Sequence, residues 1–192
     1  MFTNFWPNLA KVWGHYWGLF LEGAGLTLLL SFITVLFGTV LGSLLALARR
    51  SRLKVISVPA SGYVEVIRGT PLLLQLYLIT FLLPEVLPML NLSKFASVTV
   101  ALVLNSAAYV CEIVRAGIQA VDPGQAEAAR TLGLNARQTM TRIVLPQAVK
   151  NILPALGNEF VTVIKETSLA STFFVGDLMT VYKTAQGATF TV

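Results

Sequence analysis

The chain has 192 residues, of which 55% are hydrophobic and only 12% are charged. Intrinsic disorder is excluded, because a disordered chain combines low hydrophobicity with high net charge. A soluble globular domain is disfavoured, since such domains carry roughly 25% charged residues. A membrane span needs about 20 largely apolar residues, so this length allows at most about six spans and no separate enzyme domain.

The formal net charge is +5, which in a soluble protein would suggest nucleic acid as a partner. Here the arginines lie next to apolar segments, so the charge indicates membrane topology and no nucleic-acid binding. Cys111 is the single cysteine, which excludes a disulfide framework and a cysteine-rich metal site. Lys11 interrupts the N-terminal segment, which therefore does not resemble a cleavable signal peptide.

The first two expected elements are an interfacial helix over residues 1–22 and a membrane span over residues 23–48. The aromatic residues of the first recur at helical spacing, as in an aromatic belt. The second carries no charge. Its small residues form one stripe that permits close packing of helices, and these are Ser31, Thr34, Gly38, Gly42 and Ala46.

The second span is expected to contain a break. A helix over residues 57–68 enters from the cytoplasm, Gly69 and Pro71 interrupt it, and residues 70–88 complete the span. A short outer loop over residues 84–94 follows. We also expect Glu65 and Arg68 to pair at i,i+3.

The third span is expected over residues 95–121, with Glu112 and Arg115 forming a structural i,i+3 pair. The fourth is expected over residues 152–173. Between them, residues 122–150 are polar and predict a helix–turn–helix loop.

The ends of the two loop helices carry recognisable signals. Asp122 is the predicted N-cap of the first helix and Gln125 its capping-box partner. Gly133 is the predicted left-handed residue after that helix. Asn135 is expected to cap a second short helix that ends before Pro146.

The basic residues predict the orientation. The segments 49–54 and 122–150 carry eight of the 14 Lys and Arg residues, whereas the opposite side carries Lys11, Lys94 and Lys183. This bias places the N-terminus outside.

The loop contains Glu127-Ala-Ala, then Gly133 after three residues, then Ile143-Val-Leu-Pro146 after nine more. This pattern resembles the cytoplasmic loop of type I permeases of bacterial ABC importers. Further segments are similar to the polar amino-acid permeases (histidine, glutamine and arginine type), namely Glu65–Pro71, Glu112–Gln119, Leu145–Ala148, Leu156–Phe160 and Lys165–Leu169.

The resemblance implies an all-α polytopic membrane bundle of four to five transmembrane helices, forming one permease domain over residues 1–192 in the bacterial plasma membrane. It implies a second permease subunit, identical or related, an external amino-acid-binding protein and an ABC ATPase. In this family a fifth span follows the fourth, and the chain stops at Val192 where that span would begin, so the last span is expected to be missing, through truncation or naturally.

The ATPase would dock on the cytoplasmic loop, with leucine, methionine and isoleucine side chains (Leu132, Leu134, Met140 and Ile143) as apolar anchors. A solvated loop is the alternative. No glycine is followed by lysine, so the chain has no phosphate-binding loop; ATP and magnesium are expected on the partner, and no catalytic residue or cofactor is expected here. The docking residues are Glu127, Ala128, Ala129, Arg130, Gly133, Arg137, Ile143 and Pro146.

Polar groups inside a span are candidate substrate ligands. Glu159 could bind the ammonium group or a cationic side chain of an amino acid, or pair with a lysine of the partner subunit. Asn105 could bind substrate or a neighbouring helix. Thr70 lies at the helix break, and Asn158 and Thr162 are further polar candidates.

Two alternatives remain open. An ion-coupled secondary carrier would work alone and would show inverted repeats. A subunit that only anchors the ATPase would dock it without transporting anything.

Overall fold

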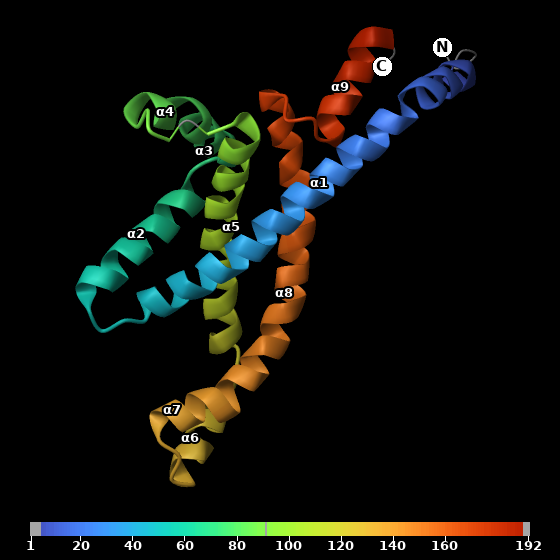
Figure 1. Ribbon diagram of the computed structural model, residues 1–192. Helices are drawn as coiled ribbons and strands as arrows, with labels where there is room; N and C mark the ends of the chain where they lie inside the picture. Colours follow the sequence, from blue (N-terminus) through green and yellow to red (C-terminus); the bar gives the residue numbers. More distant parts are fainter. Residues whose placement is uncertain (1–4, 91, 190–192) are drawn as a thin grey trace. The chain divides into compact units, whose positions relative to one another are not determined.

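The computed structural model describes residues 5–90 and 92–189. All regular structure in this part of the chain is helical (Figure 1). The longer helices are α1 (Phe5–Arg49), α2 (Lys54–Gly69), α5 (Lys94–Gln119), α8 (Leu145–Glu166) and α9 (Leu178–Thr189). The shorter ones are α3 (Leu72–Tyr77), α4 (Leu83–Val86), α6 (Pro123–Thr131) and α7 (Ala136–Thr139), with π-helical turns η1 (Leu78–Leu82) and η2 (Met140–Val144) and a 3-10 helix η3 (Thr167–Phe173).

The chain divides into two compact units. The first unit contains the described residues up to Thr34, residues 73–102, and those from Val163 onward. The second unit contains residues 35–72 and 103–162, and it therefore holds the loop over residues 122–150 and all five candidate substrate ligands.

Helix α1 is longer than the predicted first span. It continues without a break from Phe5 to Arg49, so residues 5–22 of the expected interfacial helix belong to the same helix as the span, and residues 1–4 lie outside the described part of the chain. The glycines of this segment do not interrupt it, since glycine weakens a helix by only about 1 kcal/mol. The interfacial position of its first turns stays a prediction.

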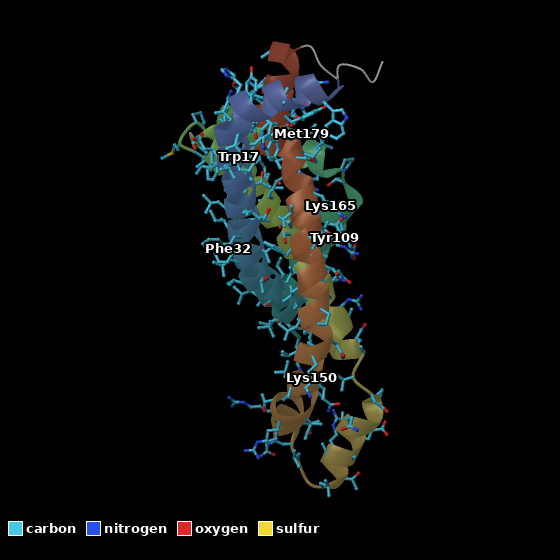
Figure 2. The ribbon with its side chains drawn as sticks, turned by 90° about the vertical axis from the view of Figure 1, so that its right-hand side faces the viewer. Trp17, Phe32, Tyr109, Lys150, Lys165 and Met179 are labelled. Atoms are coloured by element: carbon cyan, nitrogen blue, oxygen red, sulfur yellow. The ribbon has the colours of Figure 1, made fainter. Side chains whose placement is uncertain are left out.

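The small-residue stripe of α1 is confirmed, because Ser31, Thr34, Gly38, Gly42 and Ala46 are all buried. In the second unit, a Cβ added to Gly38 would lie 2.9 Å from Ser106 Oγ, and one added to Gly42 would lie 2.7 Å from the Ala107 carbonyl oxygen. Helices α1 and α5 therefore approach more closely here than larger residues would permit. The opposite face of α1, which carries Phe32, projects outward (Figure 2).

Two helices are long and apolar enough to cross a membrane among the described residues: Val12–Arg49 and Lys94–Gln119. A third span results if Lys54–Gly69 and Leu72–Val86 form one broken span. The break predicted at Gly69 and Pro71 is confirmed, because α2 ends at Gly69 and α3 begins at Leu72. Helix α8 covers most of the predicted fourth span but is not among these candidate spans, and residues 167–173 are 3-10 helix.

Helix α9 was not predicted. Within the first unit it begins beside α1, where the Leu178 N–H donates to Thr27 Oγ1 at 3.1 Å. The buried carboxylate of Asp177 accepts bonds from the Met179 N–H and the Thr180 hydroxyl. Asp177 is thus an N-cap, a signal that the sequence carries in a segment for which no element was predicted.

Candidate functional site

The first candidate site is the loop over residues 122–150, and its first helix begins as the sequence predicted. The Asp122 carboxylate accepts a hydrogen bond from the Gly124 N–H at 2.8 Å, and Pro123 occupies the first turn of α6. The predicted capping-box role of Gln125 is wrong. Its side-chain oxygen accepts a bond from Gln147 instead, so it links α6 to the start of α8.

Gly133 ends α6 in a left-handed conformation, with φ of +86°. The Gly133 N–H donates to the Arg130 carbonyl at 2.9 Å, and the Leu134 N–H donates to the Ala129 carbonyl at 3.1 Å. These two bonds form a Schellman motif, in which glycine is favoured because a Cβ is strained at this φ. The predicted role of Gly133 is confirmed, and the turn between α6 and α7 has a defined geometry.

The second loop helix begins with the full capping box that the first one lacks. Asn135 accepts from the Gln138 N–H at 2.9 Å, and Gln138 accepts from the Asn135 N–H at 3.0 Å. The prediction that this helix ends before Pro146 is wrong, because α7 continues through η2 into α8. A proline ring clashes with the carbonyl four residues earlier; the wider π-helical turn before Pro146 accommodates it.

The residues predicted to dock the ATPase divide into a buried set and an exposed set. Ala129 is buried, and Val121, Val144 and Ala148 form the core beneath the loop, against which Met140 packs. Met140 is partly buried by this packing, and its role as an anchor stays a prediction. The exposed docking residues are Glu127, Ala128, Arg130, Gly133, Arg137 and Pro146, with Ile143 partly buried.

Leu132 is the most exposed apolar side chain of the loop. It lies at the end of α6, beside the Schellman turn, with 81% of its surface exposed. Leu134 and Ile143 are partly buried. Figure 2 shows the side chains of α6 and α7 projecting outward at the end of α8 that carries Lys150. The loop thus carries one highly exposed apolar side chain, Leu132, and the exposed Arg130 and Arg137 on helices whose starts are capped.

The second candidate site is a buried carboxylate. Glu159 of α8 is only 8% exposed, and it accepts a hydrogen bond from the Ser106 hydroxyl of α5 at 2.8 Å. Asn105, next to Ser106, is 3% exposed. The structure therefore places Glu159 at a contact between α8 and α5, and it buries Asn105 one position from Ser106. Ser106 was not predicted, although its position beside Asn105 in a span was a signal.

Two of the other three predicted ligands are threonines, and their hydroxyl groups donate hydrogen bonds to backbone carbonyls of the preceding helical turn. Thr70 Oγ1 donates to the Val66 carbonyl at 2.9 Å, which caps the end of α2. Thr162 Oγ1 donates to the Asn158 carbonyl at 3.1 Å. Asn158 and Thr162 are exposed on α8. Threonine back-bonding of this kind is common in helices and leaves each oxygen able to accept a further bond.

A charged cluster that the sequence predicted only in part surrounds Glu112. The predicted Glu112–Arg115 pair is confirmed, with 2.8 Å between Arg115 Nε and Glu112 Oε2. Arg49 at the end of α1 also binds this carboxylate. Arg68 of α2 lies 3.7 Å from it, so the predicted Glu65–Arg68 pair is wrong. Contacts between helices distant in sequence have no local pattern that would reveal them.

The sequence profile of the family described as "Binding-protein-dependent transport system inner membrane component" matches residues 38–191. The chain belongs to this family. Because the matched range includes the capped loop and the buried carboxylate, both candidate sites lie within the family's shared region.

Relatives and solved structures agree with this assignment. The arginine transport system permease protein ArtQ of Bacillus subtilis (strain 168) is 43% identical over 170 residues, covering 88% of this chain and 77% of ArtQ. The L-cystine transport system permease protein TcyB of the same organism is 40% identical over 186 residues, covering 93% and 79%. The chain is thus similar to permeases of ABC importers for amino acids.

Two solved structures are similar in fold. A crystal structure of an amino acid ABC transporter with histidines has a TM-score of 0.88 at 47% identity, covering 92% of this chain and 81% of that one. The inward-facing MetNI methionine ABC transporter has a TM-score of 0.66 at 21% identity, covering 90% and 88%; that likeness shows the fold alone. The predicted family and the all-α membrane fold are confirmed: the chain is an ABC importer permease subunit.

Proposed function

We propose that this permease subunit carries polar amino acids, and that the carboxylate of Glu159 recognises a cationic group of the substrate. The support is a buried carboxylate that, among the described residues, accepts a single hydrogen bond, from the neutral hydroxyl of Ser106. A buried charge is costly unless it is compensated, and an ammonium or guanidinium group of a substrate would compensate it with strong hydrogen bonds. Asn105 and the exposed Asn158 and Thr162 would supply neutral donors and acceptors, and Thr70 would do so at the helix break.

The names of the relatives agree with this substrate class. ArtQ is named for arginine and TcyB for L-cystine, both polar amino acids with an α-ammonium group. A site built around one carboxylate fits this shared group, and it fits a cationic side chain better still.

The energy for transport would come from a separate ABC ATPase that binds ATP and magnesium. The loop over residues 122–150 would dock in a groove of that ATPase, with the exposed Leu132 as the anchor and Arg130 and Arg137 at the rim. Glu127, Ala128, Ala129, Gly133, Ile143 and Pro146 would shape this docking surface. The rigid capped turn would transmit movement of the ATPase to α8, which follows the loop without interruption.

Transport would take place between two permease subunits, identical or related, by alternating access in the bacterial plasma membrane. The N-terminus would lie outside, as the basic residues predict, and an external binding protein would deliver the amino acid. An ion-coupled carrier would need no ATPase. Whether uptake requires the ATPase therefore distinguishes the two functions.

The test is reconstitution of the chain with its ATPase and binding protein in liposomes, with a panel of amino acids. We expect arginine, histidine or glutamine to stimulate ATP hydrolysis and to accumulate only when ATP is present. Accumulation driven by an ion gradient without the ATPase would contradict the proposal. ATPase binding without uptake of any amino acid would indicate an anchoring subunit instead.

A further inference from the structure

Three helices of the second unit contribute positive charge to one carboxylate. Arg49 of α1, Arg68 of α2 and Arg115 of α5 all lie within ion-pair distance of Glu112 of α5. One negative and three positive groups leave an excess of two positive charges. This excess of positive charge attracts a further anion.

The three arginines differ in how far they remain available to that anion. The Arg49 side chain is 20% exposed and also donates to the Ser61 hydroxyl, whereas those of Arg68 and Arg115 are 42% and 44% exposed. The Arg68 guanidinium lies 5.5 Å from the centre of the Tyr109 ring, which holds it in place. Guanidinium groups bind phosphate oxygens through paired donors.

An apolar groove adjoins the cluster at the last turns of α1. Its volume is about 350 Å³, and Leu44 and Ala48 of α1, Tyr63 of α2 and Leu104 of α5 are among its walls. Ala48 immediately precedes Arg49, and Tyr63 lies two residues from Ser61, which accepts a bond from Arg49. The groove residue Ala48 and the charged residue Arg49 are thus consecutive on α1, which places the groove next to the cluster.

We propose that this surface is a binding site for an anionic phospholipid. The phosphate group binds Arg68 and Arg115, and an acyl chain lies in the groove beside Leu44. Arg49 and Glu112 hold the two arginines in position. The proposal is independent of which amino acid the chain carries.

The position of the surface selects a lipid over a soluble phosphate. Arg49 is the last residue of the candidate membrane span Val12–Arg49, the depth at which lipid head groups lie. Leu41 and Leu44 remain exposed, and on a membrane span such side chains face acyl chains. Three further basic residues, Arg50, Arg52 and Lys54, follow within five positions, and basic clusters beside a span attract anionic lipid.

The experiment measures retained lipid. The full chain, with the subunits that it carries, is purified from bacterial membranes and equilibrated in micelles containing equal amounts of phosphatidylglycerol and phosphatidylcholine. Native mass spectrometry then counts the bound lipids. We expect preferential retention of phosphatidylglycerol, and about tenfold weaker retention in the double variant Arg68→Gln/Arg115→Gln. The matched variant Arg142→Gln/Lys150→Gln removes two exposed charges elsewhere and should retain phosphatidylglycerol normally.

A variant of the groove keeps the test decisive if the charge variant fails to fold. Ala48→Phe fills the groove without changing any charge and should lower phosphatidylglycerol retention, whereas Ala116→Phe, at an exposed position of α5, should not. Lower phosphatidylglycerol retention in Ala48→Phe, with normal retention in Ala116→Phe, supports the proposal.

Three results would overturn it. The first is equal retention in the double variant and its matched control. The second is competition by inorganic phosphate as strong as that by phosphatidylglycerol, which would indicate a soluble anion. The third is quantitative disulfide formation between two copies of Leu44→Cys in a Cys111→Ser background, since a second copy would then cover the groove.

Discussion

The Ser106 hydroxyl donates a hydrogen bond to the carboxylate of Glu159 at 2.8 Å, joining α5 to α8 inside the second unit. Both side chains are buried. A serine hydroxyl orients a carboxylate without neutralising it, and it occupies only one of about four acceptor positions. The arrangement therefore leaves acceptor positions of the Glu159 carboxylate that Ser106 does not use.

Replacing Glu159 by glutamine should weaken transport of cationic amino acids selectively. The amide oxygen can still accept the Ser106 hydrogen bond, so the fold is retained while the charge is lost. A hydrogen bond to a charged group contributes about 1.5–3 kcal/mol, so KM for arginine should rise roughly tenfold or more while KM for glutamine changes little. Uptake into liposomes containing the ATPase and the binding protein measures both.

The control for this variant is Glu65→Gln, which removes an exposed carboxylate of α2. It should leave the preference between arginine and glutamine unchanged. An equal rise in KM for arginine and glutamine would place the shared α-ammonium group at Glu159, whereas unchanged KM values for both in Glu159→Gln would remove Glu159 from the substrate site.

Replacing Gly133 by aspartate should uncouple ATP hydrolysis from transport. A residue with a Cβ is strained at φ of +86°, at a cost of about 1 kcal/mol, and the new carboxylate lies beside the exposed Leu132. Distortion of the Schellman turn would change the shape of the predicted docking surface. We expect uptake to fall while ATP hydrolysis continues without responding to substrate, and the subunits should still assemble on a sizing column.

The matched control is Asn135→Asp, which adds the same charge two residues away. Aspartate is as good an N-cap as asparagine, so the start of α7 is retained. If Gly133→Asp transports as well as Asn135→Asp, the loop is not the docking element.

Leu132 should be an energetic centre of ATPase binding. With 81% of its side chain exposed at the end of α6, it can enter a pocket of the partner, and central apolar anchors contribute more than 1 kcal/mol. Leu132→Ser should therefore weaken ATPase binding about tenfold, measured by titration with labelled ATPase. Leu53→Ser, at a 63% exposed leucine between α1 and α2, is the comparison. Equal Kd values for the two variants would contradict this role.

Local signals predicted the parts of the molecule that depend on neighbouring residues. The N-cap at Asp122, the left-handed Gly133, the helix break before Pro71 and the buried small-residue stripe of α1 are all present. Each follows from the chemistry of one residue and its turn, or from helical spacing.

Errors arose where the outcome depends on contacts between distant segments or on adaptation of the backbone. Arg68 pairs with Glu112 rather than with Glu65 because α2 and α5 lie together. The helix continues through Pro146 because a π-helical turn absorbs the ring. Ser106 was missed as the partner of Glu159, since the two are 53 positions apart.

The close approach of α1 to α5 gives a prediction for stability. A Cβ added to Gly42 would lie 2.7 Å from both the Ala107 carbonyl oxygen and Val110 Cβ, so Gly42→Ala must push the two helices apart. Overpacking of this kind costs about 1–3 kcal/mol. The fluorescence of the three tryptophans during heating in detergent should show a lower Tm. Gly62→Ala, where a Cβ meets nothing within 4 Å, should keep or raise the Tm, because alanine is the better helix former. Equal decreases for both variants would mean that the α1–α5 contact is not tight at Gly42.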